Sequence, residues 1–269
     1  METQIENRST LTNRSSLFFN IGELFMVFLP PLLIISAMST WVGEDPIRSL
    51  GVVWVANVII LLMIWTGLKL RGESWANFGL TFRSISFRGG LKVFGLSLMV
   101  SFIGGAAFIL GAILMANVLG VPESADLSIY DYLKGNLGML ILSLVAVYIV
   151  GSFGEEIVCR AFLINRIAQL GAGSKHATTI AVILSSIIFG LIHYAWGPLG
   201  MIQTGFMGLA MGICYIKLKK RLWILILAHA YMDTILMVQM YLASKLTVLA
   251  MNLWFLSKIS QCNGNDKDR

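Results

Sequence analysis

The sequence is poor in charged residues, and this scarcity excludes most classes of soluble protein. Only 13% of its 269 residues are Asp, Glu, Lys or Arg, whereas 57% are hydrophobic, and the mean hydropathy is +0.79. A typical soluble domain carries about 25% charged residues, because polar side chains must help to cover its water-facing surface. Lipid makes no such demand on a spanning helix. The composition therefore predicts an all-α, polytopic transmembrane helix bundle.

Cysteine is also scarce, with three residues in the chain. Cys159 and Cys214 fall in apolar stretches and Cys262 in a polar tail, so neither a disulfide framework nor a CxxC site is expected. The HExxH pair of many zinc peptidases does not occur. The net charge of +6 is spread over short loops rather than along one polar face. This distribution is typical of membrane proteins, in which the charges of short loops set the orientation in the bilayer. We therefore expect no nucleic acid as a partner.

Apolar runs of about 20 residues, the length that crosses a bilayer, fill most of the chain. We expect about eight spans, at Leu17–Trp41, Leu50–Leu68, Leu91–Leu119, Leu137 to Val150 and on into a charged cluster, Ala177–Tyr194, Pro198–Ile216, Leu222–Leu242 and Leu246–Ile259. The last is short, and is a tilted span, an interfacial helix that leaves seven spans, or an extension of the seventh. The chain then divides into a cytoplasmic N-terminal segment (1–16), one transmembrane domain (17–259) and a polar tail (260–269).

The charges of the loops predict an orientation, because Lys and Arg concentrate in short cytoplasmic loops. The loops after the second, fourth and sixth spans are basic, whereas those after the first and third are richer in Asp and Glu. The N-terminus is then cytoplasmic, and the C-terminus is too if the eighth segment crosses. The first residues mix both charges, unlike the basic leader of a secretory signal. We expect an integral, multi-pass protein of a prokaryotic plasma membrane.

Three polar clusters interrupt the apolar spans. Ionisable groups at the bilayer centre cost about 2.5 kcal/mol or more, so those found there are functional candidates. The first cluster is Gly154-Glu155-Glu156-Ile157-Val158-Cys159-Arg160. Glu156 and Arg160 stand four residues apart on a helix and are expected to pair, whereas Glu155 points about 100° away and can act as a general base in a wet cavity. Alternatively, all three mark the cytoplasmic end of the fourth span.

The other two clusters place histidines on later spans. Phe189-x-x-x-His193 closes the fifth span, and a histidine there can take a proton, orient a water or bind a metal, although a lone one is more often interfacial. His229 and Asp233 share one face of the seventh span. They can stabilise a developing oxyanion or coordinate a metal with His193 and a glutamate; a packing hydrogen bond is the alternative. Gly205, Gly208 and Gly212 in the sixth span predict close helix packing.

The order of these motifs on successive apolar helices resembles that of a known family. Glu-Glu-x-x-x-Arg, Phe-x-x-x-His and His-x-x-x-Asp look like the motifs of the CAAX protease and bacteriocin-processing (CPBP) family of intramembrane peptidases. The resemblance covers about residues 137–241. It implies that Glu155, with His193, activates a water for attack on a peptide carbonyl, and that Glu156 and Arg160 are a supporting pair.

The resemblance also gives roles to His229 and Asp233, which stand where the family keeps its oxyanion-stabilising His and Asn. Asp233 departs from the pattern. An ionised Asp donates no hydrogen bond, so it must be protonated, orient His229 or ligate a metal. The resemblance implies that the substrate is a membrane-associated peptide or a lipidated protein C-terminus. The partners expected are membrane lipids, and the resemblance is also compatible with a membrane-protein partner. No cofactor is implied.

Three alternatives remain beside this reading. A metal-dependent version of the same peptidase would bind zinc through Glu155 or Glu156, His193, His229 and Asp233. A non-catalytic immunity protein would bind a peptide or partner without cutting it. A proton-coupled transporter would use the same groups as a relay, and it would often show paired halves with matching helix breaks, which this sequence lacks.

One question of depth separates the first two motifs. With a rise of roughly 1.5 Å per residue, His193 would lie about 25 Å along its helix from the cytoplasmic loop, whereas Glu155 is expected nearer that loop. A shared water needs both side chains within about 3 Å of it. Either the fourth span is long and tilted with Arg160 inside the cavity, or the fifth begins with an interfacial turn around Lys175 and His176.

Overall fold

A computed structural model describes residues 2–43, 45–81, 86–119, 127–171 and 174–265. These residues form helices, and no strand occurs among them. Six of the helical segments are long and apolar enough to cross a membrane, and one further apolar helix is shorter. The chain is therefore a multi-pass integral membrane protein of the all-α class, as the composition predicts.

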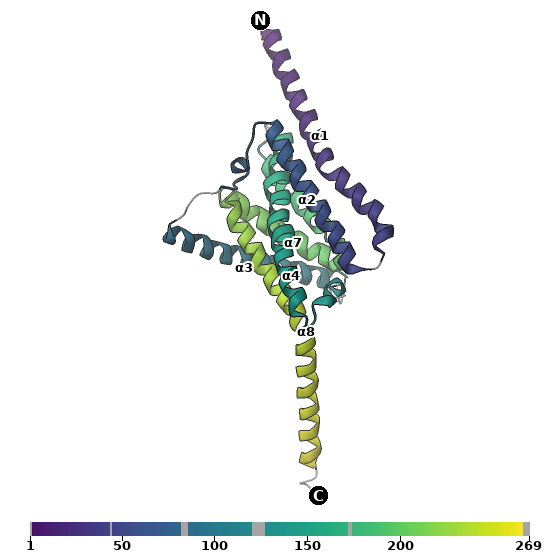
Figure 1. Cartoon of the computed structure of the whole chain (residues 1–269). Coiled ribbons are helices and arrows are strands. Elements are labelled where there is room, and N and C mark those ends of the chain that lie inside the picture. The colour runs from purple at the N-terminus through teal and green to yellow at the C-terminus, as the bar shows by residue number, and fades with distance from the viewer. Residues whose placement is uncertain (1, 44, 82–85, 120–126, 172–173, 266–269) are drawn as a thin grey trace.

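The helices form a single bundle from which both ends of the chain project (Figure 1). In chain order they are α1 (Glu2–Val42), α2 (Pro46–Leu70), η1 (Trp75–Phe78), α3 (Phe87–Leu119), η2 (Ser128–Leu133), α4 (Leu137–Val147), η3 (Tyr148–Leu163), α5 (Ile164–Leu170), α6 (Ala177–Leu191), η4 (Tyr194–Trp196), α7 (Gly197–Lys217) and α8 (Leu222–Asn265). The N-terminal part of α1 and the C-terminal part of α8 extend in opposite directions. Because α1 begins at Glu2, the predicted N-terminal segment is helical and continuous with the first span.

Side-chain caps set where two of the spanning helices begin. The Asp45 carboxylate accepts hydrogen bonds from the backbone N–H groups of Ile47 and Arg48, at 2.9 and 3.2 Å. These bonds satisfy donors that have no partner within the helix, so α2 starts one turn before the apolar run predicts. Asn136 caps α4 in the same way through Met139 N, at 3.1 Å. The predicted start of the fourth span at Leu137 is therefore confirmed.

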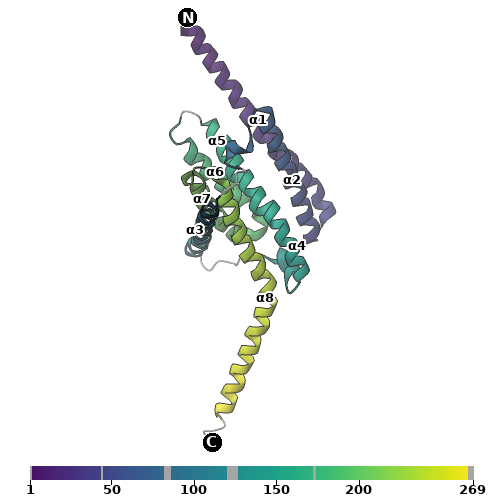
Figure 2. The ribbon, with the colours of Figure 1, turned by 60° about the vertical axis from the view of Figure 1, so that its left-hand side comes forward.

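The seventh and eighth predicted segments form one helix. Helix α8 runs without a break through both predicted segments. The residues between the segments, Ala243-Ser-Lys-Leu246, include no glycine or proline to end a helix. The segment is thus an extension of the seventh span, the third of the alternatives. The two ends of the chain point away from each other (Figure 2).

Glycines bring α6 and α7 into close contact. A Cβ atom at Gly190 would lie 2.6 Å from the carbonyl oxygen of Met201, and one at Gly208 would lie 2.9 Å from Cδ1 of Phe189. At Gly212 it would lie 3.0 Å from Val182 Cγ1. These distances are shorter than ordinary carbon contacts, so the packing predicted for the glycines of the sixth span is confirmed. It fixes Phe189 against α7.

The core of the bundle surrounds η3. Nearly all of its second half is buried, including Ile157, Cys159, Ala161 and Phe162. α2, α4, α6 and α8 all contact it. Helix α3 packs against α7 and α8; it crosses behind α4 and α8 in Figure 1 and is seen almost end-on in Figure 2. Side chains that point inward from η3 therefore lie at the centre of the molecule.

Candidate active site

The segment that carries the first motif is a π-helix rather than the expected α-helix. It extends over Tyr148–Leu163 and contains Glu155, Glu156 and Arg160. The hydrogen bonds of a π-helix run from i to i+5, and such turns are rare and frequently found at functional sites. The hydroxyl of Ser185 on α6 donates to the Cys159 carbonyl at 2.6 Å, which binds η3 to its neighbour. The angle of about 100° between the two glutamates, predicted for an α-helix, therefore does not apply.

Glu156 lies at the centre of a buried charged group. Its Oε1 atom lies 3.0 Å from Arg160 Nη1 and 2.9 Å from His229 Nδ1 on α8. All three side chains are buried. The guanidinium of Arg160 also stacks over the Phe189 ring, with its Cζ 4.2 Å from the ring centroid. The ion pair predicted from the spacing is thus present, and it has a third member from a distant part of the chain.

The other ring nitrogen of His229 faces two further carboxylates. His229 Nε2 lies 3.9 Å from Glu155 Oε2 and 3.7 Å from Asp233 Oδ1. Both distances exceed that of a direct hydrogen bond, so a water or a substrate oxygen can bridge these groups. The side chains of Glu155 and Asp233 are 21% and 14% exposed, whereas that of Glu156 is 0% exposed. Glu155 and Asp233 are therefore the carboxylates that a ligand can reach.

Ser152 on η3 holds Asp233 by a hydrogen bond, and no motif in the sequence points to this residue. The hydroxyl of Ser152 donates a hydrogen bond to Asp233 Oδ2 at 2.6 Å, and Ser152 is fully buried. A Cβ atom at the preceding Gly151 would come to 3.4 Å from the same oxygen. No local pattern marks Ser152, because one small polar residue in an apolar helix is common in membrane proteins. Asp233 thus has an acceptor role in this contact.

His193 stands at the end of α6 with one nitrogen already engaged. Its Nδ1 donates a hydrogen bond to the carbonyl oxygen of Phe189 at 2.8 Å, because a carbonyl oxygen can only accept. A neutral ring then has Nε2 as an acceptor. The Phe189 ring lies 4.9 Å from the His193 ring and 6.1 Å from the His229 ring. Within the described ranges, no hydrogen bond or ion pair joins His193 to Glu155. Phe189 therefore separates the two histidines.

Two aromatic residues from outside the motifs line the same region. Tyr130 on η2 packs edge-to-face on Trp196 of η4, with ring centroids 6.2 Å apart, and Trp196 lies 5.0 Å from the His193 ring. Burial raises the pKa of Tyr130, and the negative charges of Asp233 and Glu155 raise it further. A hydrogen bond with Trp196 lowers this pKa by a smaller amount. The phenol consequently keeps its proton and can donate it in a hydrogen bond near the carboxylates.

Features of both alternatives for the depth of the first two motifs are present. The helical segment from Leu137 to Leu170 has 34 residues, and Arg160 is buried within the bundle. A turn at Lys175 and His176 also precedes α6. Along the chain, Glu155 precedes Leu170 by about as many residues as His193 follows Ala177, and α5 and α6 contact each other. The two motifs therefore occupy comparable positions along the two neighbouring helical segments.

The described side chains do not gather into a zinc site. Zinc needs several ligand atoms at about 2 Å from one point. In the part of the chain that the structure describes, no three His, Cys, Asp or Glu side chains are grouped so that they could hold a metal ion. The arrangement around His229 is instead one imidazole with three carboxylates and one guanidinium.

A comparison with protein families matches the part of the chain that contains all three motifs. Residues 137–235 match the family model described as type II CAAX prenyl endopeptidase Rce1-like. The match supports the resemblance of this segment to the CPBP family of intramembrane peptidases. No curated protein and no solved structure matches the chain.

The Rce1-like segment begins with α4 and ends within α8, so it includes η3 and the residues around His229. Helices α1, α2 and α3 lie outside it. The match supports an intramembrane endopeptidase of the CAAX type, which is a hydrolase. The extent agrees with the resemblance noted over residues 137–241.

Proposed function

We propose that this protein is a glutamate-type intramembrane endopeptidase, which hydrolyses a peptide bond of a membrane-associated or lipidated peptide with a water activated by Glu155 and His193. One observation carries the proposal. His229 lies between a buried carboxylate, Glu156, and two partly exposed ones, Glu155 and Asp233, inside an Rce1-like segment. The partly exposed Glu155 and Asp233 can thus meet a substrate. The buried Glu156 holds the His229 ring through its other nitrogen.

Glu155 is the general base in this proposal. It is the more exposed of the two carboxylates that face His229 Nε2, and a carboxylate can take a proton from water as the water oxygen attacks the carbonyl carbon. The protonated Glu155 then gives this proton to the leaving amine, so the proton balance closes within one turnover. His193 Nε2 is the second acceptor available to orient the water, because Nδ1 is engaged by Phe189.

His229 is proposed to stabilise the oxyanion of the tetrahedral intermediate. In its imidazolium form both nitrogens donate hydrogen bonds, Nδ1 to Glu156 and Nε2 to the developing negative charge. Asp233 is proposed to orient His229 rather than to donate, since it accepts a hydrogen bond from Ser152. Glu156 and Arg160 keep the ring in place, and the phenol of Tyr130 is a further donor beside the carboxylates.

The physiological setting belongs to the same proposal. We place the enzyme in a prokaryotic plasma membrane with a cytoplasmic N-terminus, and its substrate at a lipidated protein C-terminus. Basic loops after α2 and α7 support this orientation. No cofactor takes part in the proposed reaction.

Cleavage of a quenched fluorescent peptide by purified protein in proteoliposomes tests the proposal. A farnesylated peptide and its unmodified counterpart are compared for the wild type, Glu155→Gln and the control Asp131→Asn, which alters an exposed carboxylate in a surface ion pair. We expect Glu155→Gln to abolish turnover, Asp131→Asn to retain it, and a strong chelator to have no effect. Chelator-sensitive cleavage, or an active Glu155→Gln protein, would contradict the glutamate mechanism.

A further inference from the structure

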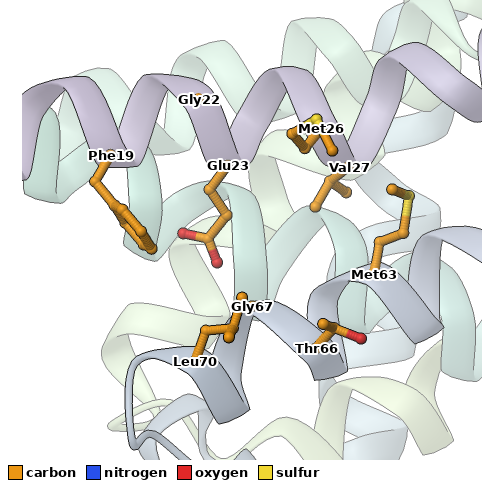
Figure 3. A pocket seen from close by; sticks show the side chains of 9 residues that line it. All are labelled: Phe19, Gly22, Glu23, Met26, Val27, Met63, Thr66, Gly67 and Leu70. Atoms are coloured by element: carbon orange, nitrogen blue, oxygen red, sulfur yellow. The ribbon is translucent and has the colours of Figure 1, made fainter.

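A groove between α1 and α2 lies apart from the peptidase motifs. It encloses about 510 Å³ and is lined by Phe19, Gly22, Glu23, Met26, Val27, Met63, Thr66, Gly67 and Leu70. Figure 3 shows the side chains of Phe19, Glu23 and Val27 pointing from α1 toward α2. Both helices lie outside the Rce1-like segment. The groove is therefore a feature that the proposed chemistry does not use.

The groove opens toward the lipid and is closed toward the catalytic centre. Met26 and Leu70, on its rim, are 64% and 76% exposed. Behind it, Val27 is buried and belongs, with Ile64 and Leu68, to the core that packs around η3. A molecule in the groove would thus touch the bilayer on one side and the core on the other. It would not reach Glu155.

The polar atoms of the lining are already engaged, so an occupant meets an apolar surface. The Glu23 carboxylate pairs with Arg71 Nη2 at 2.6 Å and with Arg166 Nε at 2.9 Å. The Thr66 hydroxyl donates to the carbonyl oxygen of Leu62 at 2.8 Å. The remaining residues of the lining are apolar. A hydrocarbon chain suits such a groove, because it needs no hydrogen-bond partner.

Cations stand at the end of the groove where α2 terminates. The Arg71 guanidinium lies over the ring of Phe19, 4.4 Å from its centroid, and the Lys69 ammonium lies 5.9 Å from the centroid of Trp65. Basic and aromatic residues of this kind mark the membrane interface. Within the described ranges no acidic side chain forms an ion pair with Lys69. Arg71 is already paired with Glu23, so Lys69 supplies the charge that attracts an anionic headgroup to this end.

We propose that the groove binds one anionic phospholipid, with an acyl chain between α1 and α2 and its phosphate at Lys69 and Arg71. Such a lipid would fix α1 against the bundle. Glu23, in the groove wall, is paired with the fully buried Arg166 of α5, and α5 continues directly from η3. Occupancy of the groove is thereby linked to the helix that carries Glu155.

Native mass spectrometry of the detergent-solubilised protein, with phosphatidylglycerol or phosphatidylcholine added, tests the proposal. Gly22 lines the groove and Gly51 lies elsewhere on an exposed face, and a Cβ at either meets no atom within 4 Å. Gly22→Leu therefore adds a bulky side chain at the wall of the groove without a clash, and Gly51→Leu is the matched control. We expect the wild type and Gly51→Leu to retain one phosphatidylglycerol, Gly22→Leu to retain it at least fivefold less, and Lys69→Gln to lose the preference over phosphatidylcholine.

Photo-crosslinking with a phosphatidylglycerol that carries a diazirine on its acyl chain locates the lipid. Labels on the segments 19–27 and 63–70 that disappear in Gly22→Leu are expected. Equal labelling of all lipid-facing helices, equal retention of both lipids by the wild type, or displacement of the label by a farnesylated peptide would each overturn the proposal. These measurements need no cleavage, so their outcome is independent of the peptidase assay.

Discussion

Ser152 donates a hydrogen bond to Asp233 across the contact between η3 and α8, with 2.6 Å between the two oxygens. This bond is directed at Oδ2, and the other oxygen of the carboxylate, Oδ1, faces His229 Nε2 at 3.7 Å. A carboxylate that is held by one oxygen can present the other in a fixed direction. The Ser152 hydroxyl thus gives Asp233 a defined partner.

Replacing Ser152 by Ala should lower the rate of peptide cleavage. A buried hydrogen bond to a charged group contributes about 1.5–3 kcal/mol, and each 1.4 kcal/mol or so of lost transition-state stabilisation is a factor of about ten in rate. If Asp233 orients His229, we expect kcat to fall by about tenfold while KM changes little. Ser152→Thr, which keeps the hydroxyl, should recover part of the rate.

A matched variant separates this effect from loss of a buried hydroxyl in general. Ser186 is buried, and its hydroxyl donates to Val182 O within the same helix at 2.6 Å. Ser186→Ala should therefore change thermal stability slightly and leave kcat intact. Equal kcat losses in the two variants would argue against a positioning role for Ser152.

Replacing Asp233 by Asn restores the family's residue but changes the charge beside His229. The Asn oxygen can accept the hydrogen bond from Ser152, and its amide group would then face His229 Nε2. Because a donor replaces a negative oxygen next to the imidazole, we expect kcat to fall by about 10- to 100-fold, less than the roughly 10²- to 10⁴-fold that a general acid or base itself contributes. Steady-state cleavage of the quenched peptide measures this, and an unchanged kcat would show that the charge of Asp233 plays no part.

Hydropathy and caps account for most of the fold that could be predicted. The start of α4 follows from Asn136, and the close contact of α6 with α7 follows from the glycines of the sixth span. The continuity of α8 could not be predicted, because Ala243-Ser-Lys-Leu246 is compatible with a helix and with a short polar connection. The π-helical conformation of η3 could not be predicted either, since no proline marks it in the sequence.

In the site, contacts within one helix could be predicted, whereas contacts between distant segments could not. The pair of Glu156 with Arg160 could be predicted because it joins residues four apart. The bond from His229 to Glu156 spans 73 positions, and the one from Ser152 to Asp233 spans 81. Spacing within one helix says nothing about such contacts, which depend on how η3 and α8 pack.

Replacing Arg160 by Ala should destabilise the protein strongly. Glu156 would remain buried with His229 alone as its partner, and breaking a buried pair from one side typically costs about 3–5 kcal/mol. Thermal melting in detergent should show a large fall in the melting temperature, and the double variant with Glu156→Gln should recover part of it. As a control, Arg48→Ala removes an exposed ion pair with Asp45, which is worth at most about 1 kcal/mol. Melting temperatures that match for the two Arg variants would contradict this account.

Replacing Gly190 by Ala should move His193 without altering any group of the proposed chemistry. The new Cβ would lie 2.6 Å from the Met201 carbonyl oxygen, so α6 and α7 must separate, and overpacking of this kind costs about 1–3 kcal/mol. His193 follows directly after α6 and Phe189 lies on the same contact. We therefore expect cleavage to fall at least tenfold at a temperature where the variant is still folded. Gly105→Ala on α3, where a Cβ meets no atom within 4 Å, should leave both activity and melting unchanged, and a loss of the same size there would sink the argument.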